Sequence, residues 1–290
     1  KFVRATDHIA EQIELVKKLE GKGLAYKTSD GIYFDTAAYE KNTRFKYGEL
    51  SNLDEIREGA RVEVNSQKRS PRDFALWKFS SADEKRDMEW DSPWGMGFPG
   101  WHIECSAMSM KYLGEQFDVH AGGEDIKSTH HPNEIAQSQG VTGKKFVKYW
   151  VHGAMLLVAG ERMATSKNNN FKIPDIIDRG FSAMALRYLF LTAHYRSPLN
   201  FTWSSMAGAQ TALDKLLQFV RQARNPKYSS HASEIRNNLS GEKLKKLEVY
   251  RVRFESAIND DMRMPEAVAV IREMLKSNIP DYDKRDALLD

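Results

Sequence analysis

The spacing of apolar residues predicts a helix and a strand pair at the start of the chain. Between Thr6 and Leu19, apolar side chains recur every three or four positions, which is the period of a helix. Two short apolar runs follow at 24–26 and 32–34. Asp30-Gly31 lies between them, and this pair is typical of a β-hairpin turn. The chain therefore begins with a predicted helix and a predicted hairpin.

Residues 36–95 are polar and rich in turn-forming residues. Within them, the basic run at 67–72 precedes the apolar and aromatic residues 74–78. We interpret the run as a solvated face, although Lys and Arg beside aromatic side chains also suit a nucleic-acid backbone. The glycine- and proline-rich segment 90–100 predicts a loop.

From residue 105 to residue 158 the pattern alternates between helix and strand. The predicted elements are a helix at Cys105–Leu113, a strand at Phe117–His120, a helix at about Asn133–Gln139 that ends at Gly140, and strands at 146–151 and 155–158. This alternation favours an α/β layer with mostly parallel strands.

The carboxy-terminal part of the pattern is helical. After a polar loop at 160–171, helices are predicted at 173–178 and 183–194, and the chain from Ser204 onward reads as helices only. These features predict a helical bundle appended to an α/β unit. The loop carries Arg162 and Lys167, five positions apart, and is either a solvated surface loop or a mobile clamp for a polyphosphate.

Composition narrows the class of protein without naming a function. The 290 residues are 41% hydrophobic and 29% charged, as in an ordinary globular protein, and the net charge of +3 permits nucleic-acid binding without arguing for it. The single cysteine, Cys105, excludes an internal disulfide, and no stretch is apolar for long enough to cross a bilayer. We expect no membrane partner and a cytoplasmic location. Because the first residue is Lys1 and there is no secretory leader, we also expect a piece of a longer protein.

The candidate chemistry lies between residues 100 and 134. If a helix begins near Pro132, His130 and Glu134 lie four positions apart on one of its faces. Together with Cys105 they offer a thiolate, an imidazole and a carboxylate, all of which bind zinc. A lone cysteine is also commonly a small buried apolar residue, and this spacing does not define a metal site by itself. Both interpretations stay open at this point.

Several motifs, taken in order, resemble the cysteinyl-tRNA synthetases, which are class I aminoacyl-tRNA synthetases. The resemblance covers nearly the whole chain and is carried by Arg4-Ala5-Thr6-Asp7-His8-Ile9, Phe74-Ala75-Leu76-Trp77-Lys78, Gly100-Trp101-His102-Ile103-Glu104-Cys105-Ser106-Ala107-Met108, Asn133-Glu134-Ile135-Ala136-Gln137-Ser138, Ala185-Leu186-Arg187-Tyr188 and Ala193-His194-Tyr195-Arg196-Ser197-Pro198-Leu199-Asn200-Phe201.

The resemblance implies a fold class and a division of the chain. The expected class is α/β, namely the second half of a class I Rossmann-like nucleotide-binding domain with a connective-peptide insertion and an appended α-helical bundle. Residues 1–97 would be the connective peptide, 98–200 the second half of the catalytic domain, and 201–290 the start of the tRNA-contacting bundle. The amino-terminal half with the HIGH signature of the family would precede Lys1.

The resemblance also implies a metal site and a substrate pocket. Three of the family's four zinc ligands fall on Cys105, His130 and Glu134, and the fourth, a cysteine, would come from the amino-terminal half. Trp101 and His120 would line the amino-acid pocket.

The implied reaction uses ATP to join cysteine to tRNA(Cys), with Mg²⁺ bound to the phosphates of ATP. Asp125 would lie near the adenylate, and Arg162 and Lys167 would take the place of the lysines of the KMSKS loop. The match departs from the family there, because Arg162 replaces the first lysine and the spacing to Lys167 is longer. Pro132 stands where the family commonly has glutamate, and Ala121 opens a turn that usually begins with glycine.

Two other functions fit parts of the same pattern. One is the related ligase that joins cysteine to a glucosaminyl-inositol in mycothiol synthesis, which shares the zinc and adenylate chemistry. The other is a non-catalytic paralogue that keeps a surface for tRNA or a protein partner.

Overall fold

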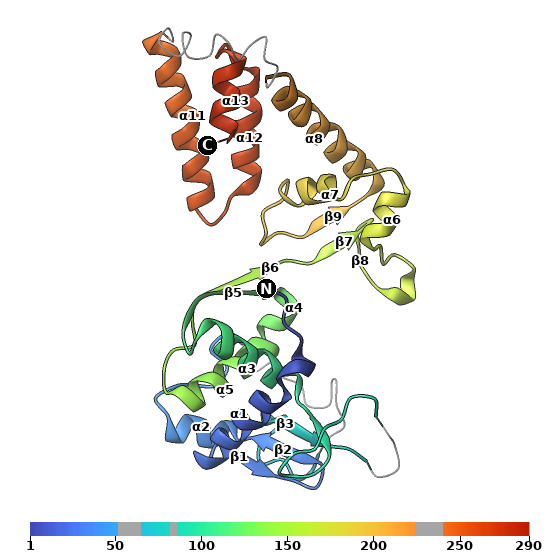
Figure 1. The fold of residues 1–290 in the computed structure, drawn as a ribbon, viewed down its shortest axis with the longest axis vertical. Coiled ribbons are helices and arrows are strands. Elements are labelled where there is room, and N and C mark those ends of the chain that lie inside the picture. The colour runs from blue at the N-terminus through green and yellow to red at the C-terminus, as the bar shows by residue number, and fades with distance from the viewer. Residues whose placement is uncertain (52–64, 82–85, 224–239, 290) are drawn as a thin grey trace. The chain divides into compact units, whose positions relative to one another are not determined.

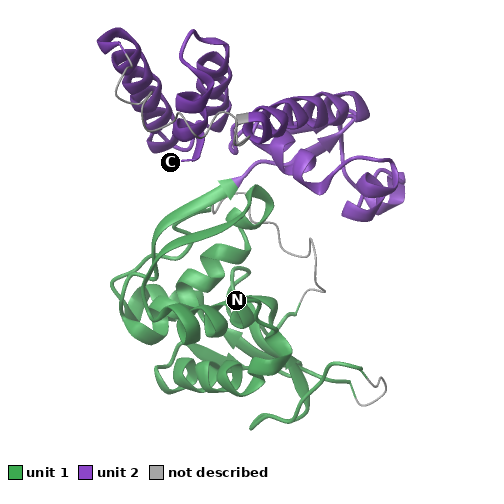
Figure 2. Cartoon of the chain, turned by 45° about the horizontal axis from the view of Figure 1, so that its top comes forward, with its two compact units in different colours: residues 1–152 green, residues 153–290 purple. Residues whose placement is uncertain are grey.

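The computed structural model describes residues 1–51, 65–81, 86–223 and 240–289. It divides into two compact units, residues 1–152 and 153–290 (Figure 2), and we describe each unit separately. The functional boundaries expected near residues 97 and 200 stay predictions. The fold class, a mixed α/β chain with a helical carboxy-terminal part, is as expected.

The largest sheet of unit 1 has four antiparallel strands in the order β1-β2-β3-β4 (Figure 1). The strands are β1 (Ala25–Lys27), β2 (Gly31–Phe34), β3 (Phe74–Phe79) and β4 (Gly97–Pro99). The predicted hairpin is confirmed as β1 and β2. The strands β1 and β2 are antiparallel because a connection as short as 28–30 can only reverse the chain. The expectation of mostly parallel strands concerned residues 105–158, which lie outside this sheet. Part of the predicted loop at 90–100 is the edge strand β4.

Helices cover this sheet and complete the core of unit 1. They are the 3-10 turn Ala5–His8, α1 (Ile9–Gly21), α2 (Thr36–Asn42), α3 (Trp101–Leu113) and α5 (His130–Thr142). Leu19, Phe34, Tyr39, Trp77 and Ile103 have no exposed surface and belong to one apolar cluster. The predicted amino-terminal helix is confirmed, and its apolar face is buried in this cluster.

Helices α3 and α5 both begin earlier than predicted. Helix α3 starts at Trp101, directly after its N-cap Gly100. Strand β4 ends at Pro99, so no loop separates the strand from the helix. Helix α5 starts at His130 and includes Pro132 in its first turn, where a missing backbone N–H breaks no hydrogen bond. It passes through Gly140 and ends at Thr142, followed by the cap residue Gly143, whose φ of 69° suits glycine.

A second sheet of unit 1 consists of β5 (Phe117–Gly123) and β6 (Val147–Gly153). Contacts advance in the same direction along both strands, from Phe117 with Phe146 to Asp118 with Lys148, which is the order of a parallel pair. The glycines at 122 and 123 belong to β5 itself and do not form a tight turn. The short helix α4 (Glu124–Lys127) follows directly.

Unit 2 begins with a small mixed sheet in the order β8-β7-β9. The strands of this sheet are β7 (Leu156–Val158), β8 (Glu161–Arg162) and β9 (Leu199–Phe201). The helices of this part of unit 2 are α6 (Ile173–Asp178), α7 (Ala183–Phe190) and α8 (Trp203–Ala223). Strand β9 is parallel to β7 and β8 is antiparallel to it. Helix α7 ends at Phe190, four residues before its predicted end.

The described residues of unit 2 after α8 are mostly helical, as expected. Helices α11 (Gly241–Asn259), α12 (Met264–Lys276) and α13 (Asp281–Leu289) form the described carboxy-terminal part (Figure 1). Asp261, between α11 and α12, accepts hydrogen bonds from the side chains of Tyr195 and Arg196 and so ties this turn to the segment before β9. Within the described residues, no helix is long and apolar enough to cross a membrane.

The carboxylate of Asp73 joins the start of β3 to β1 and α2. It is 3% exposed and accepts hydrogen bonds from the Tyr26 hydroxyl, from the backbone and hydroxyl of Thr36, and from the backbone of Ser70. The hydroxyl of Tyr26 donates to this carboxylate at 2.7 Å, and burial raises the pKa of that tyrosine well above its ordinary value.

We therefore expect Asp73→Ala to lower the free energy of unfolding of unit 1 by about 3 kcal/mol, because buried donors lose their acceptor. Denaturant unfolding followed by tryptophan fluorescence measures this change. Asp91→Ala, at an exposed position, is the control and should leave the unfolding midpoint in place. Equal midpoints for the two variants would contradict a structural role for Asp73.

Candidate metal centre

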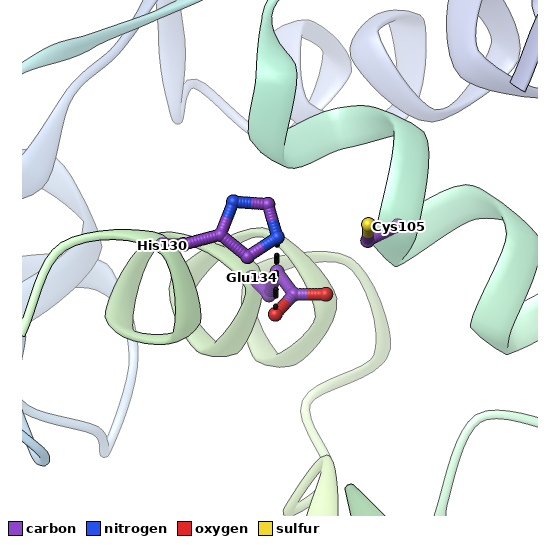
Figure 3. Close-up of side chains that lie close together, drawn as sticks. All are labelled: Cys105, His130 and Glu134. Atoms are coloured by element: carbon purple, nitrogen blue, oxygen red, sulfur yellow. Dashed lines mark ion pairs between the residues drawn. The ribbon is translucent and has the colours of Figure 1, made fainter. Parts of the chain in front are cut away.

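Two helices of unit 1 bring a thiol, an imidazole and a carboxylate together. Cys105 lies on α3, and His130 and Glu134 lie one turn apart on α5 (Figure 3). Their ligand atoms all lie within 4.8 Å of one another. His130 Nε2 is 3.6 Å from Glu134 Oε2. The three residues that the sequence suggested as zinc ligands thus form one cluster.

Close backbone packing fixes the positions of α3 and α5. A Cβ atom on Gly100 would lie 2.1 Å from the carbonyl oxygen of Ala75, so only glycine lets α3 start against β3. A Cβ atom on Gly140 would lie 3.0 Å from the Leu24 side chain, in the core beneath α5. These contacts hold the two helices where Cys105 can face Glu134.

A second group of donors shares the same carboxylate. His120 on β5 and His131 on α5 place their ligand atoms within 4.8 Å of each other and of Glu134. Their Nε2 atoms lie 3.5 Å and 3.8 Å from Glu134 Oε2. Sequence reasoning placed His120 in a substrate pocket and gave His131 no role. The signal available for His131 was its position three residues before Glu134 on the same helix.

The electrostatics of the cluster disfavour charge on its members. Glu134 is fully buried, and among the described residues neither of its oxygens has a hydrogen-bond partner. Burial raises the pKa of this carboxyl to about 8. Burial, with the neighbouring imidazoles, lowers the pKa of both His120 and His130 to about 4. Burial and then the charge of Glu134 raise the pKa of the Cys105 thiol to about 12.

Zinc fits this donor set. Four ligands at zinc bond lengths of about 2.0–2.3 Å lie about 3.3–3.8 Å apart in a tetrahedron, and the measured N–O separations fall in that range. A cation would also supply the partner that the buried Glu134 oxygens lack. The imidazoles with a low pKa are neutral at physiological pH, which is the form that binds metal.

Other histidines lie against the imidazoles of the two donor groups. His102 Nδ1 lies 2.9 Å from His130 Nδ1, and His152 Nε2 lies 2.8 Å from His131 Nδ1. In both pairs the Nδ1 atom is engaged and the Nε2 atom faces Glu134, as in metal sites whose ligands have outer partners. Sequence reasoning gave His102 and His152 no such role, because neither has a helical spacing to Glu134.

Both residues expected to line a substrate pocket border the cluster. Trp101 is 51% exposed, and the centre of its ring lies 4.4 Å from that of His130. The ring of His120 lies 4.8 Å from both His131 and Trp150. Trp150, on β6, is an aromatic neighbour that the sequence did not indicate.

The residues expected to contact ATP lie outside the cluster. Asp125 is exposed in α4, directly after β5. Arg162 and Lys167 belong to unit 2, where Arg162 ends β8 and Lys167 ends the 3-10 turn Thr165–Lys167. Lys167 Nζ forms an exposed ion pair of 2.9 Å with Glu161 Oε2.

Residues 1–211 match the family model of the class I tRNA synthetase (C) catalytic domain. The chain belongs to this family. Among its relatives, "Cysteine–tRNA ligase 1" of Burkholderia lata is 45% identical over 96% of this chain and 55% of that protein. "Cysteine–tRNA ligase" of Treponema denticola is 41% identical over 97% of the chain and 58% of that protein. The synthetase chain therefore spans somewhat more than half the length of these relatives.

A solved structure shares the fold. It is described as an arginyl tRNA synthetase from Campylobacter jejuni. The match spans 99% of this chain and 59% of the chain of that structure, with a TM-score of 0.51 and 13% sequence identity. At this identity the likeness concerns the fold alone.

Because Glu134 belongs to both donor groups, we expect Glu134→Gln to weaken zinc binding by the synthetase chain by at least about 100-fold. This exceeds the 10–100-fold cost of losing an outer partner of a ligand. Competition with a chromophoric chelator measures the affinity. Glu14→Gln, an exposed substitution on α1, is the control, and an affinity equal to that of the control would show that Glu134 is not a ligand.

Proposed function

We propose that the chain is part of a cysteine–tRNA ligase that activates cysteine with ATP and transfers it to tRNA(Cys) in the cytoplasm. The observation that supports this most directly is the cluster of Cys105, His130 and Glu134 around buried, unpartnered carboxylate oxygens. Family membership and the names of the relatives agree with it.

The cluster suits the selection of cysteine against serine. The two amino acids differ by a thiol in place of a hydroxyl, and packing contacts alone discriminate poorly between groups of such similar size. Zinc held by Cys105, His130 and Glu134 would supply a soft Lewis acid that prefers a thiolate ligand. In this proposal Trp101 and His120 border the substrate and the fourth protein ligand is a cysteine of the HIGH-containing segment.

The rest of the reaction follows from the proposed substrates. The carboxylate of cysteine attacks the α-phosphorus of ATP, and the bond to the leaving pyrophosphate breaks. A terminal ribose hydroxyl of the tRNA then attacks the carbonyl carbon and releases AMP. Arg162 and Lys167 would stabilise the charge that develops on the polyphosphate, with Mg²⁺ on the phosphates and Asp125 near the adenylate.

Cysteine-dependent exchange of pyrophosphate into ATP tests this function in a protein that includes the HIGH-containing segment. Exchange together with charging of tRNA(Cys) supports the proposal. Exchange without charging would favour the mycothiol ligase, with which the chain shares the proposed cysteine-activating site. No exchange would favour a non-catalytic tRNA-binding protein.

In the same protein, we expect Cys105→Ser to lower the rate of cysteine-dependent exchange by at least about 10-fold, because a zinc ligand is lost. Discrimination against serine should fall with it, since coordination would no longer select the thiol. Ser109→Ala, one turn later on α3, is the matched control. Unchanged discrimination in Cys105→Ser would count against selection by the metal.

We expect Lys167→Ala to slow adenylate formation by about 100-fold, the lower end of the cost of losing one charge-stabilising donor. Cysteine binding should change little, because the lysine would contact only the polyphosphate. Single-turnover kinetics separate the two quantities, and Lys172→Ala, an exposed lysine ahead of α6, is the control. An unchanged single-turnover rate would show that another residue stabilises this charge.

A further inference from the structure

The imidazoles of His120 and His131 lie beside the proposed zinc ligands and have no part in the proposed ligand set. They come from β5 and α5, and both Nε2 atoms are within 3.8 Å of Glu134 Oε2. Two imidazoles and one carboxylate form a common ligand set of catalytic zinc sites, in which the fourth position stays open.

The Nε2 atom of His131 is a buried polar atom that has no hydrogen-bond partner among the described residues. The side chain is 1% exposed. The other ring nitrogen, Nδ1, lies 2.8 Å from His152 Nε2. When Nδ1 donates its proton to His152, Nε2 keeps its lone pair and faces the buried carboxylate. A buried nitrogen and the buried Glu134 Oε2 thus lie 3.8 Å apart with no hydrogen bond between them.

We propose that His120, His131 and Glu134 form a second position for a divalent cation of the zinc type. All three imidazoles approach the same oxygen, Glu134 Oε2, and in this proposal the two positions are alternatives, so that one chain holds an ion either at Cys105, His130 and Glu134 or at His120, His131 and Glu134. The second position uses no thiolate and takes its ligands only from unit 1. The inference concerns metal binding by this chain and is independent of its catalytic activity.

Occupancy of the second position would change the neighbourhood of the first. An ion bound there engages His120, whose ring contacts Trp150 and Phe117. It also withdraws Glu134 from His130. An ion in the second position is thus a competitor of an ion in the first, and excess metal adds no second ion.

Titration of the chain with Co²⁺ tests the proposal, because a thiolate ligand gives Co²⁺ a charge-transfer absorption in the near ultraviolet and imidazole and carboxylate ligands do not. For Cys105→Ser we expect one Co²⁺ per chain, bound more weakly and without that absorption. Adding His131→Asn to Cys105→Ser should weaken the remaining binding by at least about 10-fold.

The control adds His8→Asn to Cys105→Ser. His8 is also a buried histidine of unit 1, but it bonds to the backbone of Arg4 and to Tyr112. Because His131 is fully buried, its replacement also removes packing, so His120→Asn gives an independent test at a half-buried position on β5. Circular dichroism of each variant shows whether the fold is kept.

Three results would overturn the proposal. They are loss of all Co²⁺ binding in folded Cys105→Ser, binding in that variant that neither His120→Asn nor His131→Asn weakens, and two Co²⁺ ions bound at once by the unaltered chain. The first two would leave the Cys105 position untouched. Failure of the second position is therefore distinguishable from failure of the proposed function.

Discussion

The burial of one carboxylate without hydrogen-bond donors constrains the whole of unit 1. An ionised group in an apolar interior is costly unless something compensates its charge. Among the described residues, the Glu134 carboxylate has no hydrogen-bond partner, and it lies beside the Cys105 thiol and imidazoles whose pKa is lowered by burial. Protonation of the carboxylate relieves this cost, which is why its pKa rises to about 8. A divalent cation relieves it more completely and at the same time favours the deprotonated form of Cys105.

The surrounding fold holds the donors in place against this cost. Helix α5 is buried along most of its length, and Gly140 lets it approach the side chains of Leu19 and Leu24 closely. Gly100 does the same for α3 against β3. The cluster therefore depends on close packing at Gly100 and Gly140, and its donor side chains come from two helices and a strand and not from loops.

Local periodicity allowed much of this arrangement to be predicted. The four-residue spacing of His130 and Glu134 is a property of any helix, so their common face could be expected before the helix was seen. Spacing alone could not place Cys105 beside these two residues, because its position depends on how α3 packs against α5. The position of His131 escaped prediction for the same reason, since β5 supplies its partner His120. The hairpin of β1 and β2 was predicted from its turn, but the addition of β3 and β4 to it was not, because strand order depends on connections and packing that apolar periodicity does not encode.

The ion pair between Glu161 and Lys167 joins β8 to the 3-10 turn that follows it in unit 2. Both side chains are at least half exposed, at 61% and 50%, so the pair contributes no more than about 1 kcal/mol and is screened by salt. A multiply charged anion could displace Glu161 from Lys167 at little cost. The lysine is thus held only weakly by Glu161, and ionic strength sets how firmly it is held.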